Sequence, residues 1–252
     1  MNLSAEHISG IAKSIMETNR HLKTVLVQLG PVVGDFRLRQ LMHAAGEKKT
    51  VTLHKESGCS FAVDVCKCYF SPRLSYERSR IARLVKPCET IINMFAGVGC
   101  FSIVIAKRER AVKVFSIDIN PEAIYFMKKN VCLNRVYPQV IPIVGESKEI
   151  VDVQFQGSAD RVLMPLPEKA FEYLASAVSS LKSSGGWIHY YDFVHACKHE
   201  DPAGKAKAKV IKKLSKLNVP FEIPFSRVVR PTGPNWYQVV LDIHAARVSD
   251  KS

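Results

Sequence analysis

Three segments of the chain each end a strand-like run with residues that suit a nucleoside ligand. Gly97 and Gly99 follow the β-branched run ETIINMF and precede a helical pattern. Glycines at this point let a ligand approach the backbone and expose the amides at the start of the helix. Asp118 ends the next run, nineteen residues after Gly99, where a carboxylate can bind both hydroxyls of a ribose. Glu146 follows the third run, near the expected place of an adenine amino group.

The glycine pattern is G-x-G without a third glycine, which favours a smaller nucleoside ligand over a dinucleotide. Any one of these features alone is more typical of a tight turn or a helix cap. Taken together and in this order, they predict a pocket for S-adenosylmethionine.

The elements that must position these residues alternate along the chain. We expect strands at 89–95, 112–118, 139–144, 160–166 and 185–193, with helices at 100–108, 121–134 and 168–182 between them and a short link after 144. Strands separated by helices imply right-handed crossovers, so the sequence predicts an α/β fold with a doubly wound, mostly parallel, Rossmann-like sheet. A lysine-rich helix at 205–217 and an antiparallel strand pair at 221–231 and 236–245 complete the edge of this sheet.

The first part of the chain has a different pattern. A helix at 5–19 is followed by short strands at 24–29, 50–53 and 60–65, and a further helix at 77–85 is entered through Ser71-Pro72. We therefore expect a small N-terminal α+β domain at 1–68 and the larger domain at 69–252.

The amino-acid composition indicates which kinds of partner the protein can bind. Lysine and arginine exceed aspartate and glutamate by 13, and the isoelectric point is near 9.5, which favours a polyanion such as nucleic acid. No apolar stretch suits a membrane span or a signal peptide, and no obligatory protein partner is evident. The seven cysteines form no CxxC pair, so we expect reduced thiols, no metal site and a cytoplasmic location.

Basic residues gather in three places that can contact RNA phosphates. A solvated surface is the alternative interpretation for the lysine-rich helix. The three groups are Arg73, Arg78, Arg80, Arg83 and Lys86; the lysines within 205–216; and Arg227 with Arg230.

Several sequence blocks resemble the archaeal and eukaryotic tRNA guanine-37 N1-methyltransferases. The resemblance runs over 34–243 and is carried by YFSPRLSYER, INMFAGVGCFSI, IDINPEAI, KKNVCLNRV, DRVLMPLP and GGWIHYYDF. It implies methyl transfer from S-adenosylmethionine to N1 of guanosine 37, with the anticodon stem-loop of tRNA as partner. It also implies that the N-terminal domain grips the anticodon arm. The chain begins too late for the further small domain that many relatives carry, so we expect fewer tRNA contacts.

The reaction sets the residue types that the site needs. N1 of guanine carries a proton at neutral pH, so methylation needs a base near N1 and a donor near O6. The resemblance implies that Glu77, in SPR-x₃-ER, is the base and that Arg37 binds O6. Arg39 lies close enough in sequence to exchange roles with Arg37. The expected cofactor-binding residues are Tyr69, Phe95, Ala96, Gly97, Gly99, Asp118, Ile119, Glu146 and Pro165, and the expected substrate-binding residues are Arg39, Arg73, Arg78 and Pro167.

Two positions depart from the family pattern. Asn93 replaces an aspartate before MFAG, and Pro165 replaces the asparagine of the N-x-P-x block. A proline side chain donates no hydrogen bond to guanine. The change keeps open aminocarboxypropyl transfer from the same cofactor, which close relatives perform on a modified guanosine 37. A non-catalytic tRNA-binding protein is a further alternative, disfavoured because Glu77, Gly97 and Asp118 are present.

Overall fold

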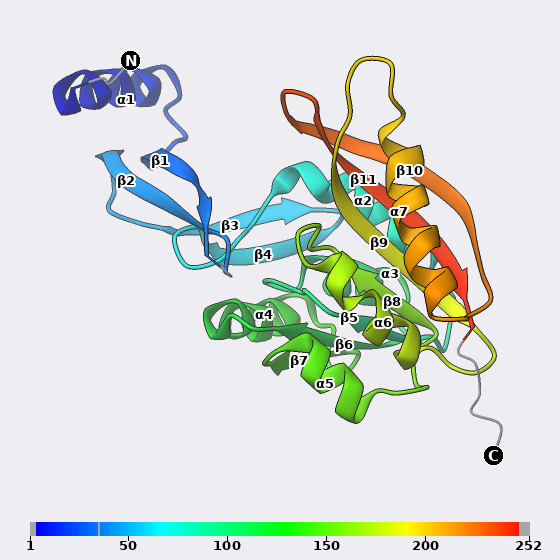
Figure 1. Cartoon of the computed structure of the whole chain (residues 1–252). Coiled ribbons are helices and arrows are strands. Elements are labelled where there is room, and N and C mark those ends of the chain that lie inside the picture. The colour runs from blue at the N-terminus through cyan, green and yellow to red at the C-terminus, as the bar shows by residue number, and fades with distance from the viewer. Residues whose placement is uncertain (1–3, 35, 247–252) are drawn as a thin grey trace.

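Seven strands form one sheet in a computed structural model that describes residues 4–34 and 36–246 (Figure 1). The strand order is β10-β11-β9-β8-β5-β6-β7. The strands β5 to β9 run parallel, and β10 and β11 run antiparallel at one edge, as the sequence predicts. The strands are β5 (Thr90–Asn93), β6 (Lys113–Asp118), β7 (Val140–Val144), β8 (Arg161–Met164), β9 (Gly186–His195), β10 (Phe221–Gly233) and β11 (Trp236–Ala245).

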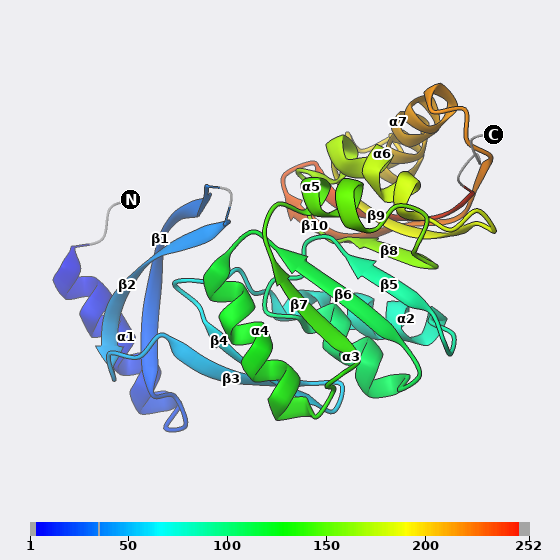
Figure 2. The same ribbon diagram turned by 90° about the horizontal axis from the view of Figure 1, so that it is seen from below.

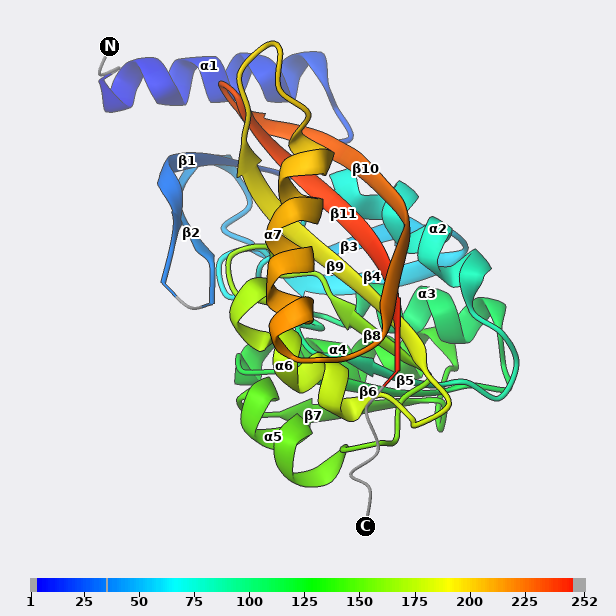
Figure 3. The same ribbon diagram turned by 45° about the vertical axis from the view of Figure 1, so that its right-hand side comes forward.

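Helices cover both faces of this sheet (Figure 2). One buried cluster joins the sheet to α2 (Ser75–Leu84), α3 (Cys100–Arg108) and α4 (Pro121–Asn134). A second cluster joins the other face to α5 (Ser147–Gln154), α6 (Ala170–Ser180) and α7 (Pro202–Lys216). Figure 3 shows α7 lying along β9 and β11. The expected link after 144 is therefore wrong in part, because it contains α5, which begins where the Glu146 side chain accepts the Glu149 amide.

The N-terminal segment holds α1 (Ala5–Thr18), β1 (Thr24–Val33), β2 (Leu38–Gly46), β3 (Val51–Glu56) and β4 (Cys59–Asp64). The pair β1–β2 and the pair β3–β4 are separate antiparallel hairpins. Both views place α1, β1 and β2 to one side of the large sheet (Figures 1 and 2). The strand β2 was not predicted from the sequence, because most of its side chains are half-buried and its burial does not alternate.

The β3–β4 hairpin packs on the larger part of the molecule. Phe61 and Val63 are fully buried in the cluster of α3 and α4. Asn130 of α4 exchanges two hydrogen bonds with the backbone of Ala62, and Asn134 exchanges two with the backbone of Ser60. The domain boundary at residue 68 stays a prediction, and this packing ties β3 and β4 to the larger unit.

A chain of buried polar groups fixes α2 to the sheet. Arg80 of α2 binds both carboxylate oxygens of Asp242 on β11, at 2.6 and 3.1 Å. His189 on β9 donates from Nδ1 to Asp242 (2.6 Å) and accepts from Arg161 on β8 at Nε2. Burial alone would raise the pKa of Asp242, but the hydrogen bonds and charges of His189 and Arg80 hold it at about 2. Arg80 also donates to Glu77, so this network sets the position of that carboxylate.

Asp242→Asn should lower the free energy of unfolding by about 2–4 kcal/mol at pH 7, because it removes the charge that Arg80 faces inside the protein. The deficit should shrink as the pH falls below 3.8 toward 2, since the wild-type carboxylate then becomes protonated and loses its own contribution. Urea unfolding of both proteins at several pH values measures this. Asp152→Asn, on α5 and outside this network, is the control. A deficit that does not change with pH would contradict the assignment.

Candidate active site

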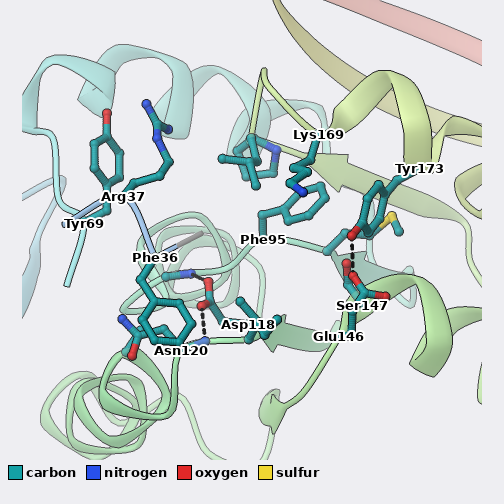
Figure 4. A pocket seen from close by; sticks show the side chains of 16 residues that line it. Phe36, Arg37, Tyr69, Phe95, Asp118, Asn120, Glu146, Ser147, Lys169 and Tyr173 are labelled. Atoms are coloured by element: carbon teal, nitrogen blue, oxygen red, sulfur yellow. Dashed lines mark hydrogen bonds between the residues drawn. The ribbon is translucent and has the colours of Figure 1, made fainter. Parts of the chain in front are cut away.

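A cavity of about 270 Å³ lies where β5, β6, β7 and β8 end (Figure 4). Carboxyl ends of parallel strands meet at one edge of a sheet, and ligands bind there in open α/β folds. Of the residues expected from the sequence, the lining contains Arg37, Tyr69, Phe95, Gly97, Asp118, Ile119, Glu146 and Pro165. It does not contain Ala96, Gly99, Glu77, Arg39, Arg73, Arg78 or Pro167.

The two glycines of the first turn serve different needs. Gly97 has φ 56°, and an added Cβ would meet nothing closer than 3.9 Å, so the backbone is open toward the cavity. Gly99 has φ 89°, and a Cβ there would lie 2.7 Å from the Met127 side chain of α4. Gly97 is therefore the glycine that faces a ligand, and Gly99 permits helix packing.

Asp118 joins this turn to the end of β6. Its carboxylate accepts the Gly97 amide at 2.6 Å and the Asn120 amide at 2.9 Å. Burial raises the pKa of Asp118, and these two amides counteract the rise. Each carboxylate oxygen can accept two hydrogen bonds, so the lone pairs that the amides leave suit hydroxyl donors such as those of a ribose.

Glu146 is held by two donors at the opposite end of the cavity. It accepts the Glu149 amide and the hydroxyl of Tyr173, the latter at 2.5 Å (Figure 4). Next to it, the buried Ser147 hydroxyl has no hydrogen-bond partner in the described part of the chain. These groups give the cavity a polar end that can bind the edge of a base.

Arg37 comes from the N-terminal segment and reaches the rim of the cavity beside Tyr69 (Figure 4). Its guanidinium lies 4.2 Å from the centre of the Tyr69 ring and forms an ion pair with Glu168. Arg39 lies 5.5 Å from the same ring and donates to the Phe70 carbonyl. The geometry therefore favours Arg37 over Arg39 as the arginine that faces a substrate.

The structure does not bring Glu77 into the cavity lining. The Glu77 side chain is 1% exposed, and its carboxylate accepts from Arg80, Arg227 and Tyr191. Tyr190 is the last residue of β9 that pairs with β8, and Tyr191 comes directly after it. The cluster around Glu77 therefore lies beside the end of β8, which Pro165 follows.

The predicted substrate contacts have different surroundings. Arg78 is buried, and its Nε and Nη2 donate to the carboxylate oxygens of Glu56 on β3 at 2.5 and 2.6 Å. This ion pair connects α2 to the β3–β4 hairpin. Arg73 is exposed on a short 3₁₀ helix, Pro72–Leu74. Pro167 lies within the loop between β8 and α6 and is buried. Of these three, Arg73 alone has an exposed side chain.

Asn93 lies in the core below the first turn. Its side chain is fully buried, donates to the Ser102 hydroxyl at 3.1 Å and accepts the Phe95 amide at 3.4 Å. An amide in place of the family aspartate thus keeps the turn bonded without a buried charge.

Five cavity residues with polar or aromatic side chains were not predicted from the sequence: Phe36, Asn120, Ser147, Lys169 and Tyr173. Phe36 adjoins Arg37, and Ser147 adjoins Glu146, so proximity to a predicted residue was an available signal. Lys169 and Tyr173 reach the cavity from the region of α6, and no local pattern marks them.

None of the described helices has the length and apolar character to cross a membrane. Within residues 4–34 and 36–246, no group of three or more histidine, cysteine or acidic residues is arranged to hold a metal ion.

Known proteins are similar to this chain both in sequence and in fold. The family described as the TRM5/TYW2 methyltransferase domain matches residues 52–219. The tRNA (guanine(37)-N(1))-methyltransferase Trm5b of Pyrococcus abyssi is 39% identical over 245 residues, which cover 96% of this chain and 71% of that protein. The tRNA 4-demethylwyosine(37)-methyltransferase Taw21 of Saccharolobus solfataricus is 40% identical, over 97% of this chain and 88% of that protein. The crystal structure of Trm5b from Pyrococcus abyssi superimposes with a TM-score of 0.83 at 37% identity, covering 96% of this chain and 70% of that one.

Asp118→Ala should weaken the binding of S-adenosylmethionine by about 1.5–3 kcal/mol, roughly 10- to 150-fold, because the ribose hydroxyls lose a charged acceptor. Affinity for tRNA should barely change. Titration calorimetry measures the first quantity and a filter-binding assay the second. Asp118→Asn, which keeps an oxygen acceptor for the Gly97 amide, should have a smaller effect. An unchanged affinity in both variants would remove Asp118 from the site.

Proposed function

This chain belongs to the TRM5/TYW2 methyltransferase family, and we propose that it transfers the methyl group of S-adenosylmethionine to N1 of guanosine 37 in tRNA. One observation carries the proposal. Arg37, from the N-terminal segment, lines the same cavity as Asp118 and Glu146, so a cation stands where the acceptor base would meet the cofactor. Negative charge develops on O6 when N1 loses its proton, and a fixed guanidinium stabilises that charge.

The cavity fits the cofactor in chemistry as well as in place. Asp118 would bind the ribose, and Glu146 and Ser147 the adenine, where a buried hydroxyl stands without a partner among the described residues. S-adenosylmethionine supplies a methyl group on a sulfonium, and the departing thioether is neutral and needs no acid. The protein must therefore align the two reactants and remove the N1 proton.

Glu77 remains the proposed base, but the groups that bind its carboxylate must make room for the substrate. Arg227 of the edge strand β10 and Arg80 of α2 both bind its carboxylate, and Tyr191 donates to it at 3.0 Å. Burial and the nearby Glu77 charge raise the pKa of Tyr191, so its hydroxyl stays protonated as a donor. Arg227 has a side chain that is 32% exposed, and its contact with Glu77 must open before N1 can reach the carboxylate.

A second methyl acceptor is the candidate alternative. The relative from Saccharolobus is named for methylation of 4-demethylwyosine at position 37, and this chain spans 88% of it. Pro165 also removes the side-chain amide that the family pattern places near guanine. Aminocarboxypropyl transfer is less well supported, because three relatives at 39–40% identity are named methyltransferases.

Exposed basic residues offer phosphate contacts to the RNA. Arg73, four residues before Glu77, and Lys212 and Lys216 on α7 are exposed and suit such contacts. The end of α7 lies beside the start of β9, away from the strand ends that form the cavity. We expect this activity in the cytoplasm, where the seven free cysteines stay reduced.

The reaction is tested with tRNA that carries either guanosine or 4-demethylwyosine at position 37. Cofactor labelled in the methyl carbon, or separately in the aminocarboxypropyl carbons, is added, and the tRNA is digested to nucleosides. Methyl label in N1-methylguanosine is the expected result. Methyl label on the modified base alone would favour the second acceptor, and label from the other carbons would overturn methyl transfer.

Glu77→Gln should reduce single-turnover methyl transfer by about 10²–10⁴-fold, because an amide cannot accept the N1 proton. The dissociation constants of tRNA and cofactor should change little, which separates lost chemistry from lost binding. Circular dichroism of the variant controls for folding of the buried site. Near wild-type rates, with chemistry limiting, would leave Glu77 a structural role on α2.

A further inference from the structure

The loop after β8 carries an acidic residue that contacts Arg37, a residue of the cavity lining. Pro165 lines the cavity but has no side-chain donor or acceptor. Three residues later, the Glu168 side chain is 45% exposed, and its Oε1 lies 3.2 Å from Nη2 of Arg37. This ion pair joins the loop to the N-terminal segment beside the cavity that Arg37 lines.

One donor of Arg37, its Nε, is buried and has no hydrogen-bond partner among the described residues. The guanidinium is fixed against the Tyr69 ring at 4.2 Å (Figure 4). The carboxylate of Glu168 also keeps lone pairs for a further donor, because each of its oxygens can accept two hydrogen bonds. The rim therefore presents a donor and an acceptor side by side.

This arrangement matches the outer edge of guanine. That edge carries an acceptor, O6, followed by two donors, N1–H and the 2-amino group. Adenine carries an amino donor where guanine has O6, so that donor would face Arg37, and adenine has no 2-amino group for Glu168. A guanidinium and a carboxylate in contact therefore suit guanine and disfavour adenine.

We propose that Glu168 is a specificity residue that accepts a hydrogen bond from the 2-amino group of the target guanine, while Arg37 binds O6. The inference rests on the proposed methylation of guanosine 37. Glu168, three residues after Pro165, thus supplies a hydrogen bond to guanine that a proline side chain cannot make.

The test removes each partner of the hydrogen bond separately. Single-turnover methyl transfer is measured with tRNA carrying guanosine 37 or inosine 37, which lacks only the 2-amino group. Wild-type protein should methylate guanosine about 10- to 100-fold faster than inosine, the usual effect of one hydrogen bond to a charged group. Glu168→Ala should be slower on guanosine by a similar factor and should no longer distinguish the two. Glu168→Gln, which keeps an oxygen acceptor, should retain part of the preference.

Glu172→Ala is the matched control, because it removes the same charge from an exposed residue of α6 nearby. It should keep both the rate and the preference. Failure of wild-type protein to methylate guanosine 37 would overturn the proposed function and this inference together. If wild-type protein is active but ignores the 2-amino group, or if Glu168→Ala keeps the full preference, the inference alone is overturned.

Discussion

The hydrogen bond from the Gly97 amide to the Asp118 carboxylate joins two neighbouring strands at the point where a ligand must enter. It is 2.6 Å long and links the turn after β5 to the end of β6. The turn can approach the carboxylate because Gly97 adopts a positive φ, which most residues avoid. One contact between backbone and side chain therefore holds in place both the turn that leads into α3 and the Asp118 wall of the cavity.

The acceptor side of the cavity is built differently, from segments far apart in the chain. Arg37 and Tyr69 come from the first part of the chain, and the loop at 165–168 comes from the sheet. Glu77 is positioned by Arg80 and Arg227, which belong to a helix and to an edge strand. The cofactor side is thus fixed by local turns, whereas the acceptor side depends on how the N-terminal segment and the sheet edge meet.

This contrast explains which features the sequence predicted. The helices at 100–108 and 121–134 and the strand at 236–245 have the predicted bounds, because strong local patterns mark them. Asp118 and Glu146 were predicted because parallel strands bring their carboxyl ends to one edge. The burial of Glu77 could not be predicted, since Arg227 lies 150 residues away in the chain. The burial of Arg78 could not be predicted either, because its carboxylate partner Glu56 lies 22 residues earlier, in the β3–β4 hairpin.

The two asparagines of α4 have a consequence for the exposed edge of the β3–β4 hairpin. Asn130 and Asn134 each donate to one backbone carbonyl and accept one backbone amide of β4, as a neighbouring strand would. A strand edge with free amides and carbonyls invites pairing with another chain. The helix thereby closes that edge without adding a strand. It also prevents β4 from sliding by one residue, which would turn Phe61 and Val63 out of the core.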